Sequence, residues 1–162
     1  MSYRVREATH RDADVLVRHR IAMFTDMGLA LDAPALDAAF RVWLVENMAA
    51  GVYRAWLVEA EDGSVAAGGG ISILPWPPGP SYMGNRIAMV YNVYSEPAHR
   101  RHGLARLIME TIHTWAASHG ISSVALNAST DGRPGRATWA IAWRSSTTCT
   151  PNRRIGAADW RV

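Results

Sequence analysis

Residues 93–105 read Val-Tyr-Ser-Glu-Pro-Ala-His-Arg-Arg-His-Gly-Leu-Ala, and the rest of the chain is organised around this stretch. The residues before it, 87–94, are rich in β-branched and aromatic side chains, which is typical of a buried strand. After it, Leu104, Ile108 and Ile112 recur at helical spacing, and Gly120 is suited to end that helix. The pattern therefore predicts a strand, a basic turn and an amphipathic helix in succession.

The basic turn, Arg100-Arg101-His102-Gly103, is expected to bind an anion. It lies where the first backbone N–H groups of the following helix have no partner inside the helix. Those donors attract a negative charge, Gly103 leaves room for a ligand near the backbone, and guanidinium groups add charge-assisted bonds to phosphate. We therefore expect a phosphate-bearing cofactor here, and the alternative is an ordinary turn with its arginines in solvent.

Composition indicates one domain of a globular protein. The chain has 162 residues, of which 49% are hydrophobic and 19% are charged. Cys149 is the single cysteine, so no internal disulfide is expected, and we expect no metal site. The first residues contain no apolar signal core and no segment is apolar enough to cross a membrane, so we expect a cytoplasmic protein. The formal charge of +3 permits anionic partners, but the arginines are scattered and nucleic acid is not expected.

The remaining elements are predicted from periodicity and from their start and stop signals. Thr9 and Asp32 are candidate N-caps of two helices, of which the first is predicted over 10–27. The Gly68-Gly69-Gly70 run suggests a bulge or a close backbone contact. A proline-rich loop over 75–82 carries Trp76 and Tyr82, our candidates for substrate binding. Such a loop walls a pocket, meets a partner subunit or packs its aromatic rings on the core. Strands are expected at 3–8, 53–60, 65–74, 87–94 and 124–126.

The pattern Arg100-x-x-Gly103-x-Ala105, between a strand and a helix, resembles the acyl-coenzyme A signature of the GNAT acetyltransferase superfamily. The order of predicted elements matches that family from Tyr3 to about Ala128. The resemblance implies an α/β (α+β) fold, with a mixed, mostly antiparallel central sheet flanked by helices. In this family the sheet opens like a V between its fourth and fifth strands, and the pantetheine arm of the cofactor enters the split.

The resemblance also assigns roles in binding acetyl-coenzyme A. Main-chain groups at the end of the fourth strand would contact the pantetheine arm, Arg100 would open the motif, and the following turn would hold the pyrophosphate. The implied reaction is attack of a neutral amine on the acetyl thioester, with a backbone N–H near Val93 stabilising the developing oxyanion. The residues concerned are Val93, Tyr94, Ser95, Arg100, Arg101, His102, Gly103, Leu104, Ala105 and Arg106.

The catalytic groups are less clearly marked than the cofactor site. Many relatives carry a glutamate on the fourth strand as the base, but residues 86–94 contain no carboxylate. Tyr91 and Asn92 are therefore the catalytic candidates, and regular strand alternation would turn only one of them toward the substrate. We expect Glu96 to belong to the turn that follows the strand.

The end of the chain departs from the family pattern. A tyrosine commonly protonates the leaving thiolate in relatives, yet residues 135–162 contain no tyrosine. We expect residues 1–134 to form the acyl-coenzyme A-binding domain and residues 135–162 to be an atypical C-terminal segment of the same domain, in which 138–143 has the composition of a strand. The leading hypothesis is an N-acetyltransferase acting on a primary amine of a small molecule or a peptide. The alternatives are a catalytically impaired acyl-coenzyme A-binding module and, with the lowest weight, a nucleic-acid binder; the resemblance also allows a homodimer.

Overall fold

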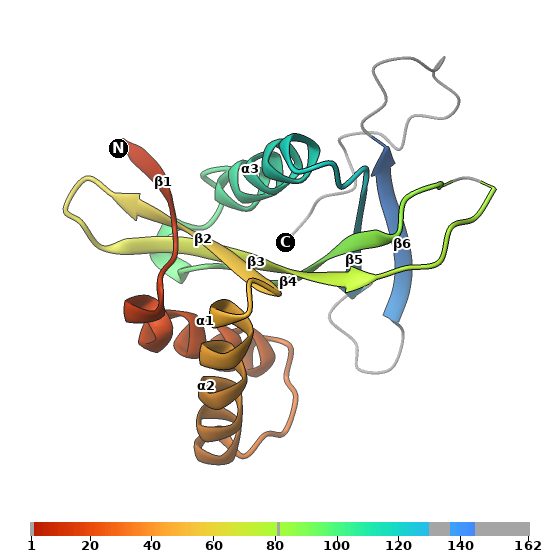
Figure 1. Ribbon diagram of the computed structural model, residues 1–162. Coiled ribbons are helices and arrows are strands. Elements are labelled where there is room, and N and C mark those ends of the chain that lie inside the picture. The colour runs from red at the N-terminus through yellow and green to blue at the C-terminus, as the bar shows by residue number, and fades with distance from the viewer. Residues whose placement is uncertain (1, 81, 130–136, 145–162) are drawn as a thin grey trace.

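The chain folds around one central sheet with helices on both faces (Figure 1). The structure is a computed structural model and describes residues 2–80, 82–129 and 137–144. The predicted order of elements is confirmed, and 138–143 lies inside the last strand. The elements are β1 (Tyr3–Glu7), the 3₁₀ turn η1 (His10–Asp12), α1 (Ala13–Asp26), α2 (Ala33–Ala49), β2 (Tyr53–Ala60), β3 (Val65–Pro75), β4 (Arg86–Ser95), the 3₁₀ turn η2 (Pro97–His99), α3 (Leu104–Ser118), β5 (Ser123–Ser129) and β6 (Ala137–Arg144).

The sheet is mixed and mostly antiparallel, as the sequence predicted. Its six strands lie in the order of the chain, β1-β2-β3-β4-β5-β6. Every neighbouring pair is antiparallel except β4 and β5, which are parallel and are joined by η2 and α3. A parallel pair needs a long crossover connection, and α3 is that crossover.

The helices begin and end close to the predicted signals. The Asp32 side chain accepts a hydrogen bond from the Ala35 N–H at 3.0 Å, and Gly51 and Gly120 follow the ends of α2 and α3 with φ of 68° and 69°. The prediction of one continuous helix from residue 10 is wrong in its first turn. The Asp12 carboxylate accepts a bond from the Thr9 N–H at 2.7 Å, and this capping box encloses the 3₁₀ turn η1 before α1 begins.

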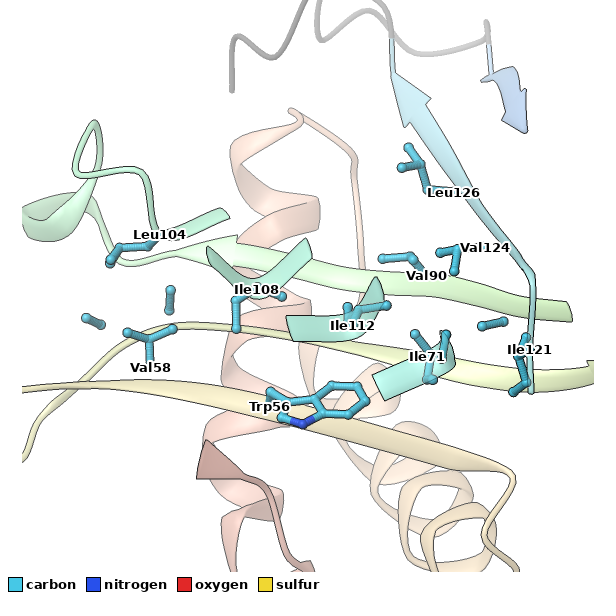
Figure 2. Close-up of a cluster of buried hydrophobic side chains, with 14 residues drawn as sticks. Trp56, Val58, Ile71, Val90, Leu104, Ile108, Ile112, Ile121, Val124 and Leu126 are labelled. Atoms are coloured by element: carbon cyan, nitrogen blue, oxygen red, sulfur yellow. The ribbon is translucent and has the colours of Figure 1, made fainter. Parts of the chain in front are cut away.

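Helix α3 closes one face of the sheet (Figures 1 and 2). Its buried side chains recur at helical spacing, as the sequence predicted, and pack on alternate residues of the strands beneath. Ala88 and Val90 are the β4 members of this cluster, and both are buried. The labelled members in Figure 2 are Trp56, Val58, Ile71, Val90, Leu104, Ile108, Ile112, Ile121, Val124 and Leu126.

Helices α1 and α2 cover the opposite face (Figure 1). Leu16, Phe40 and Leu44 pack there on the alternate set of β2 side chains, which includes Tyr53 and Leu57. Strand β3, which lies between the two helical layers, carries three consecutive glycines at 68–70. A Cβ on Gly68 would lie 2.9 Å from Leu57 Cδ2 and one on Gly69 would lie 2.7 Å from Ile108 Cγ2, so the predicted close contacts are confirmed on both faces.

Candidate active site

The sheet opens where β4 and β5 run side by side. Their pairing is limited to Ala88 with Val124, Met89 with Ala125 and Val90 with Leu126, although β4 continues to Ser95 and β5 to Ser129. Within the part of the chain that the structure describes, residues 91–95 therefore have no strand partner on their β5 side. Backbone N–H and C=O groups without a ladder partner need another partner, and a ligand rich in amides can supply one. The predicted V-shaped split is present at this position.

The N-terminus of α3 presents a row of free backbone donors next to the split. Arg101 and Gly103 both have left-handed φ, 65° and 74°, and this conformation turns the chain from η2 into α3. No acceptor in the described part of the chain takes the N–H groups of residues 101–106, whereas the N–H of Leu107 already donates to the Gly103 carbonyl at 3.0 Å. The positive end of the helix dipole adds to these donors, so the turn is built to hold an anion.

The polar side chains of this turn differ in the partners they contact. Arg101, His102 and Arg106 are exposed beside the free donors; Arg106 is paired with Glu110 at 2.7 Å, whereas Arg101 has no ion-pair partner among the described residues. The His102 Nδ1–H donates to the carbonyl oxygens of His99 and Arg100 at 3.1 and 3.0 Å, which leaves its Nε2 free of the proton when the ring is neutral.

Leu104 takes part in a different way, because its side chain is buried in the core below α3. Only its backbone N–H can therefore contribute to the anion site, like that of Ala105.

Arg100 is turned away from the row of donors and toward α1. Its guanidinium forms an ion pair with Asp26, its Nε donates to the Ser95 carbonyl at 3.2 Å, and its Cζ lies 5.6 Å from the ring centroid of Tyr94. The hydrogen bond to Asp26 raises the pKa of Arg100. The structure thus gives the first residue of the motif a positioning role, in which it fastens the turn and the end of β4 to α1.

A bulge in β4 places Tyr91 and Asn92 on the same face of the sheet. Gly70 pairs with Tyr91 and Gly68 with Tyr94, so β4 carries one residue more than β3 over this interval. Asn92 has φ of 55°, a left-handed conformation that asparagine tolerates better than most residues. The prediction that only one of the two could face the substrate side is therefore wrong, because the bulge interrupts the alternation.

Asn92 is held by a polar network beneath the split. Its side-chain oxygen accepts a bond from Nη1 of Arg20 at 2.6 Å, and its nitrogen donates to the Tyr53 hydroxyl at 3.4 Å. Asn92 and Tyr53 are both buried, and burial raises the pKa of Tyr53 to about 12, so its hydroxyl is neutral at neutral pH. Neither Asn92 nor Tyr53 is a base under these conditions; both are hydrogen-bonding groups.

Glu96 joins the end of β4 to α1, which extends the predicted role in the turn. Its Oε1 accepts bonds from Arg18 at 3.0 Å and from Nε2 of His19 at 3.1 Å. Burial lowers the pKa of His19, which is 1% exposed, and the ring of Tyr94 packs against it with centroids 5.2 Å apart. These contacts fix the position of the strand end that the cofactor would follow.

The proline-rich loop connects β3 to β4 at the other end of β4 from the basic turn. The Trp76 N–H donates to the Asn85 carbonyl at 2.8 Å, and the Tyr82 hydroxyl donates to the Arg86 carbonyl. Tyr82 and Tyr91 both pack against the small cluster of Ile87, Met89 and Ala125, whereas Trp76 is 47% exposed. Tyr82 is therefore the aromatic residue of this loop that shares a face of β4 with the site.

Sequence reasoning missed Arg20 and Tyr53. Arg20 occupies a position of the apolar stripe of α1, and a charged residue inside such a stripe was a signal that could have identified it. Tyr53 starts β2 and gave no signal, because only the tertiary structure brings it to Asn92. Among the described residues, no group of three or more His, Cys, Asp or Glu side chains could hold a metal ion, and no helix is long and apolar enough to cross a membrane.

Comparison with known proteins identifies the family. A sequence model of the acetyltransferase (GNAT) family matches residues 22–140. The chain belongs to the GNAT acetyltransferase family. The GNAT family uses acetyl-coenzyme A, which agrees with the predicted cosubstrate, and its members act on small-molecule or peptide acceptors. The chain matches no curated protein sequence.

Solved structures of GNAT proteins agree with this assignment. A GCN5-related N-acetyltransferase from Ralstonia eutropha is 30% identical, with a TM-score of 0.72 over 94% of this chain and 99% of that one. A predicted acetyltransferase from Clostridium acetobutylicum, solved with acetyl-CoA, is 24% identical, with a TM-score of 0.69 over 82% of this chain and 85% of that one. The second similarity shows the GNAT fold alone.

Proposed function

We propose that this GNAT protein is an N-acetyltransferase that moves the acetyl group of acetyl-coenzyme A to a primary amine of a small molecule or a peptide. The observation that carries the proposal is the position of the β4–β5 split directly beside the free N-terminus of α3. One site would hold the amide-rich arm of the cosubstrate, and the other would hold its phosphates.

The residues present fit acetyl-coenzyme A. The N–H groups of residues 101–106 would donate to the pyrophosphate, and the exposed guanidinium of Arg101 would add charge-assisted bonds. Backbone groups of Val93, Tyr94 and Ser95 that face the split would contact the pantetheine arm. When bound, the cosubstrate supplies an activated acetyl thioester.

The acceptor amine would approach from the α1 and α2 face of β4. The opposite face is closed by α3, because Ala88 and Val90 are buried in one cluster with the apolar side chains of α3; Figure 2 shows Val90 in this cluster. On the α1 and α2 face the bulge places Tyr91 and Asn92 together, and Tyr82 packs on the same small cluster as Tyr91. These side chains would position the acceptor or a water molecule beside the split.

The reaction needs a lone pair on the amine nitrogen and a route for one proton. The nitrogen forms a bond to the acetyl carbon, the carbon–sulfur bond breaks, and the electron pair leaves on sulfur as a thiolate. A backbone N–H near Val93 would stabilise the negative charge that develops on the acetyl oxygen. Tyr91 and Asn92 would orient the amine or a water molecule that carries its proton away, without acting as strong bases.

A second candidate is a module that binds acyl-coenzyme A without turnover. It is favoured by the absence of a carboxylate in β4 and by the bonds of Asn92, whose amide cannot accept a proton as a base would. Both candidates predict binding of acetyl-coenzyme A, so binding alone does not distinguish them.

Thiol release in the presence of acetyl-coenzyme A and a panel of amines distinguishes the two candidates. Calorimetry on the same protein first establishes that acetyl-coenzyme A binds. The enzyme is expected to release thiol in an amine-dependent manner and to give the N-acetylated product by mass spectrometry. Tight binding with no release for any amine would instead support the impaired module.

A further inference from the structure

Arg20 is a half-buried arginine whose guanidinium lies between two aromatic rings. It lies on α1 with its Cζ 5.0 Å from the ring centroid of Phe24 and 4.6 Å from that of Phe40. Its Nη1 donates to the side-chain oxygen of Asn92, and its Nε is buried without a hydrogen-bond acceptor among the described residues. The two aromatic faces and Asn92 therefore hold the guanidinium in a fixed position below the split.

No carboxylate in the described part of the chain neutralises this guanidinium. Arg6, Arg18, Arg41, Arg54 and Arg100 each form an ion pair with an aspartate or a glutamate, and Arg20 forms none. The titratable side chains that interact electrostatically with it are Tyr53 and Tyr91, and burial keeps the Tyr53 hydroxyl neutral. Removing a cation from water without a counter-charge is costly, and an arginine stays protonated, so the described residues leave a half-buried positive charge unmatched here.

The charge lies on the side of β4 from which the acceptor would approach. Arg20 contacts Asn92, and Asn92 lies in the bulge at the point where β4 leaves β5. An acceptor whose amine is held near the split would have its other groups within reach of the guanidinium. His19, the preceding residue of α1, is buried against Glu96 and Tyr94, so its side chain points to the end of β4 and not to the guanidinium of Arg20.

We infer that Arg20 binds a carboxylate of the acceptor, and that the acceptors of this acetyltransferase are amines that carry a carboxylate, such as amino acids. The inference deepens the proposed function and rests on it. A planar carboxylate matches the planar donors of a guanidinium, and Asn92 occupies only one of the terminal nitrogens. The ligand would supply the counter-charge that the described chain lacks.

The test compares free amino acids with their amides, because each pair differs only at the carboxylate. Wild-type protein is expected to acetylate the acids with a kcat/KM at least about 10-fold higher than the amides. Arg20→Met keeps an apolar stem between the two phenyl rings, and it is expected to bring this ratio close to one, mainly through a higher KM for the acids. The amine of an amino acid and that of its amide differ in basicity, but this difference is the same for wild type and variant. It therefore cancels when the acid-to-amide ratio of kcat/KM in the variant is compared with that in wild type.

Arg41→Met is the matched control, because Arg41 is an arginine of α2 whose ion pairs with Asp14 and Asp37 lie at the surface. It is expected to leave the ratio of acid to amide unchanged. If Arg20→Met does not fold, inhibition of the wild-type enzyme by N-acetyl amino acids and by their amides replaces it, and stronger inhibition by the acids is expected.

Thiol release from amines with no preference for the acids, or equal inhibition by acids and amides, overturns this inference and leaves the proposed function standing. Thiol release from no amine at all overturns the proposed function and the inference with it. A preference for acids that Arg20→Met retains would place the carboxylate site elsewhere and would also overturn the assignment.

Discussion

Arg20 of α1 and Asn92 of β4 are 72 residues apart in sequence, and Nη1 of the first donates to Oδ1 of the second at 2.6 Å. This bond fixes the side chain of Asn92 at the point where β4 separates from β5. The position of α1 therefore determines which groups line the open side of the split. Because Asn92 also has a left-handed backbone, we expect its replacement to affect both the stability and the activity of the protein.

Replacing Asn92 tests the backbone and the amide separately. Asn92→Ala and Asn92→Gly both remove the acceptor of Arg20, but only glycine adopts φ of 55° without strain. We expect the alanine variant to lose about 2–4 kcal/mol of unfolding free energy and the glycine variant about 1 kcal/mol less than that, measured by urea denaturation. Both variants should lower kcat/KM, and wild-type turnover in either one would show that the amide has no role in positioning.

Gly103 lies in the proposed cofactor site, and Gly63, in the turn between β2 and β3, is its matched control. Both have left-handed φ, 74° and 81°, and a Cβ on either would meet no atom within 4 Å. Replacement by alanine should therefore cost each variant a similar unfolding free energy, about 1 kcal/mol. Only Gly103→Ala should weaken the binding of acetyl-coenzyme A in calorimetry, because its Cβ would stand among the free N–H donors. Equal affinities in the two variants would argue against a phosphate site at this turn.

The two adjacent arginines of the motif should separate binding from stability. Arg101 has no ion-pair partner among the described residues, so Arg101→Ala should weaken acetyl-coenzyme A binding about 3- to 10-fold at low salt, with little change in stability. Arg100→Ala removes the ion pair with Asp26 and the bond to Ser95, and should lower the melting temperature. A binding defect that does not shrink as salt is added would contradict the electrostatic role of Arg101.

The ion pair between Arg6 of β1 and Asp12 of η1 is expected to make a contribution to folding stability that is lost in acid. Hydrogen bonds from Arg6 are the largest cause that lowers the pKa of Asp12 to about 2. Because the folded pKa is below the unfolded one, the contribution is complete above about pH 4 and is lost as the pH falls toward 2. It should amount to roughly 1–2 kcal/mol after allowance for solvent screening.

Denaturation of Asp12→Asn at several pH values checks this contribution. The variant should be less stable than wild type at pH 7, and the difference should shrink as the pH falls below 4. Asp14→Asn is the control for the loss of a charge at the surface, because that side chain is 86% exposed. A difference that stays constant down to pH 2 would show that the Asp12 carboxylate is not stabilised in this way.

The order of the elements could be predicted from the sequence alone, and the same local signals led us to expect an anion site at the start of α3. Helical spacing of apolar residues, cap residues such as Asp32 and the run of basic residues before Leu104 are local signals, because helix ends and their free N–H groups depend on neighbouring residues. The signature around Gly103, in its context of a strand before it and a helix after it, indicated the GNAT family, and the family model over residues 22–140 confirms it.

The side chains that meet beside the split on the α1 face could be recognised only in the folded chain. The bulge that turns Tyr91 and Asn92 to one face depends on the pairing of β4 with the glycines of β3. The unmatched charge of Arg20 and the orientation of Arg100 toward Asp26 depend on contacts between α1 and β4, across distant parts of the chain. Local patterns carry no record of which distant side chains neutralise a charge, so the groups expected to select the acceptor became visible only in the folded protein.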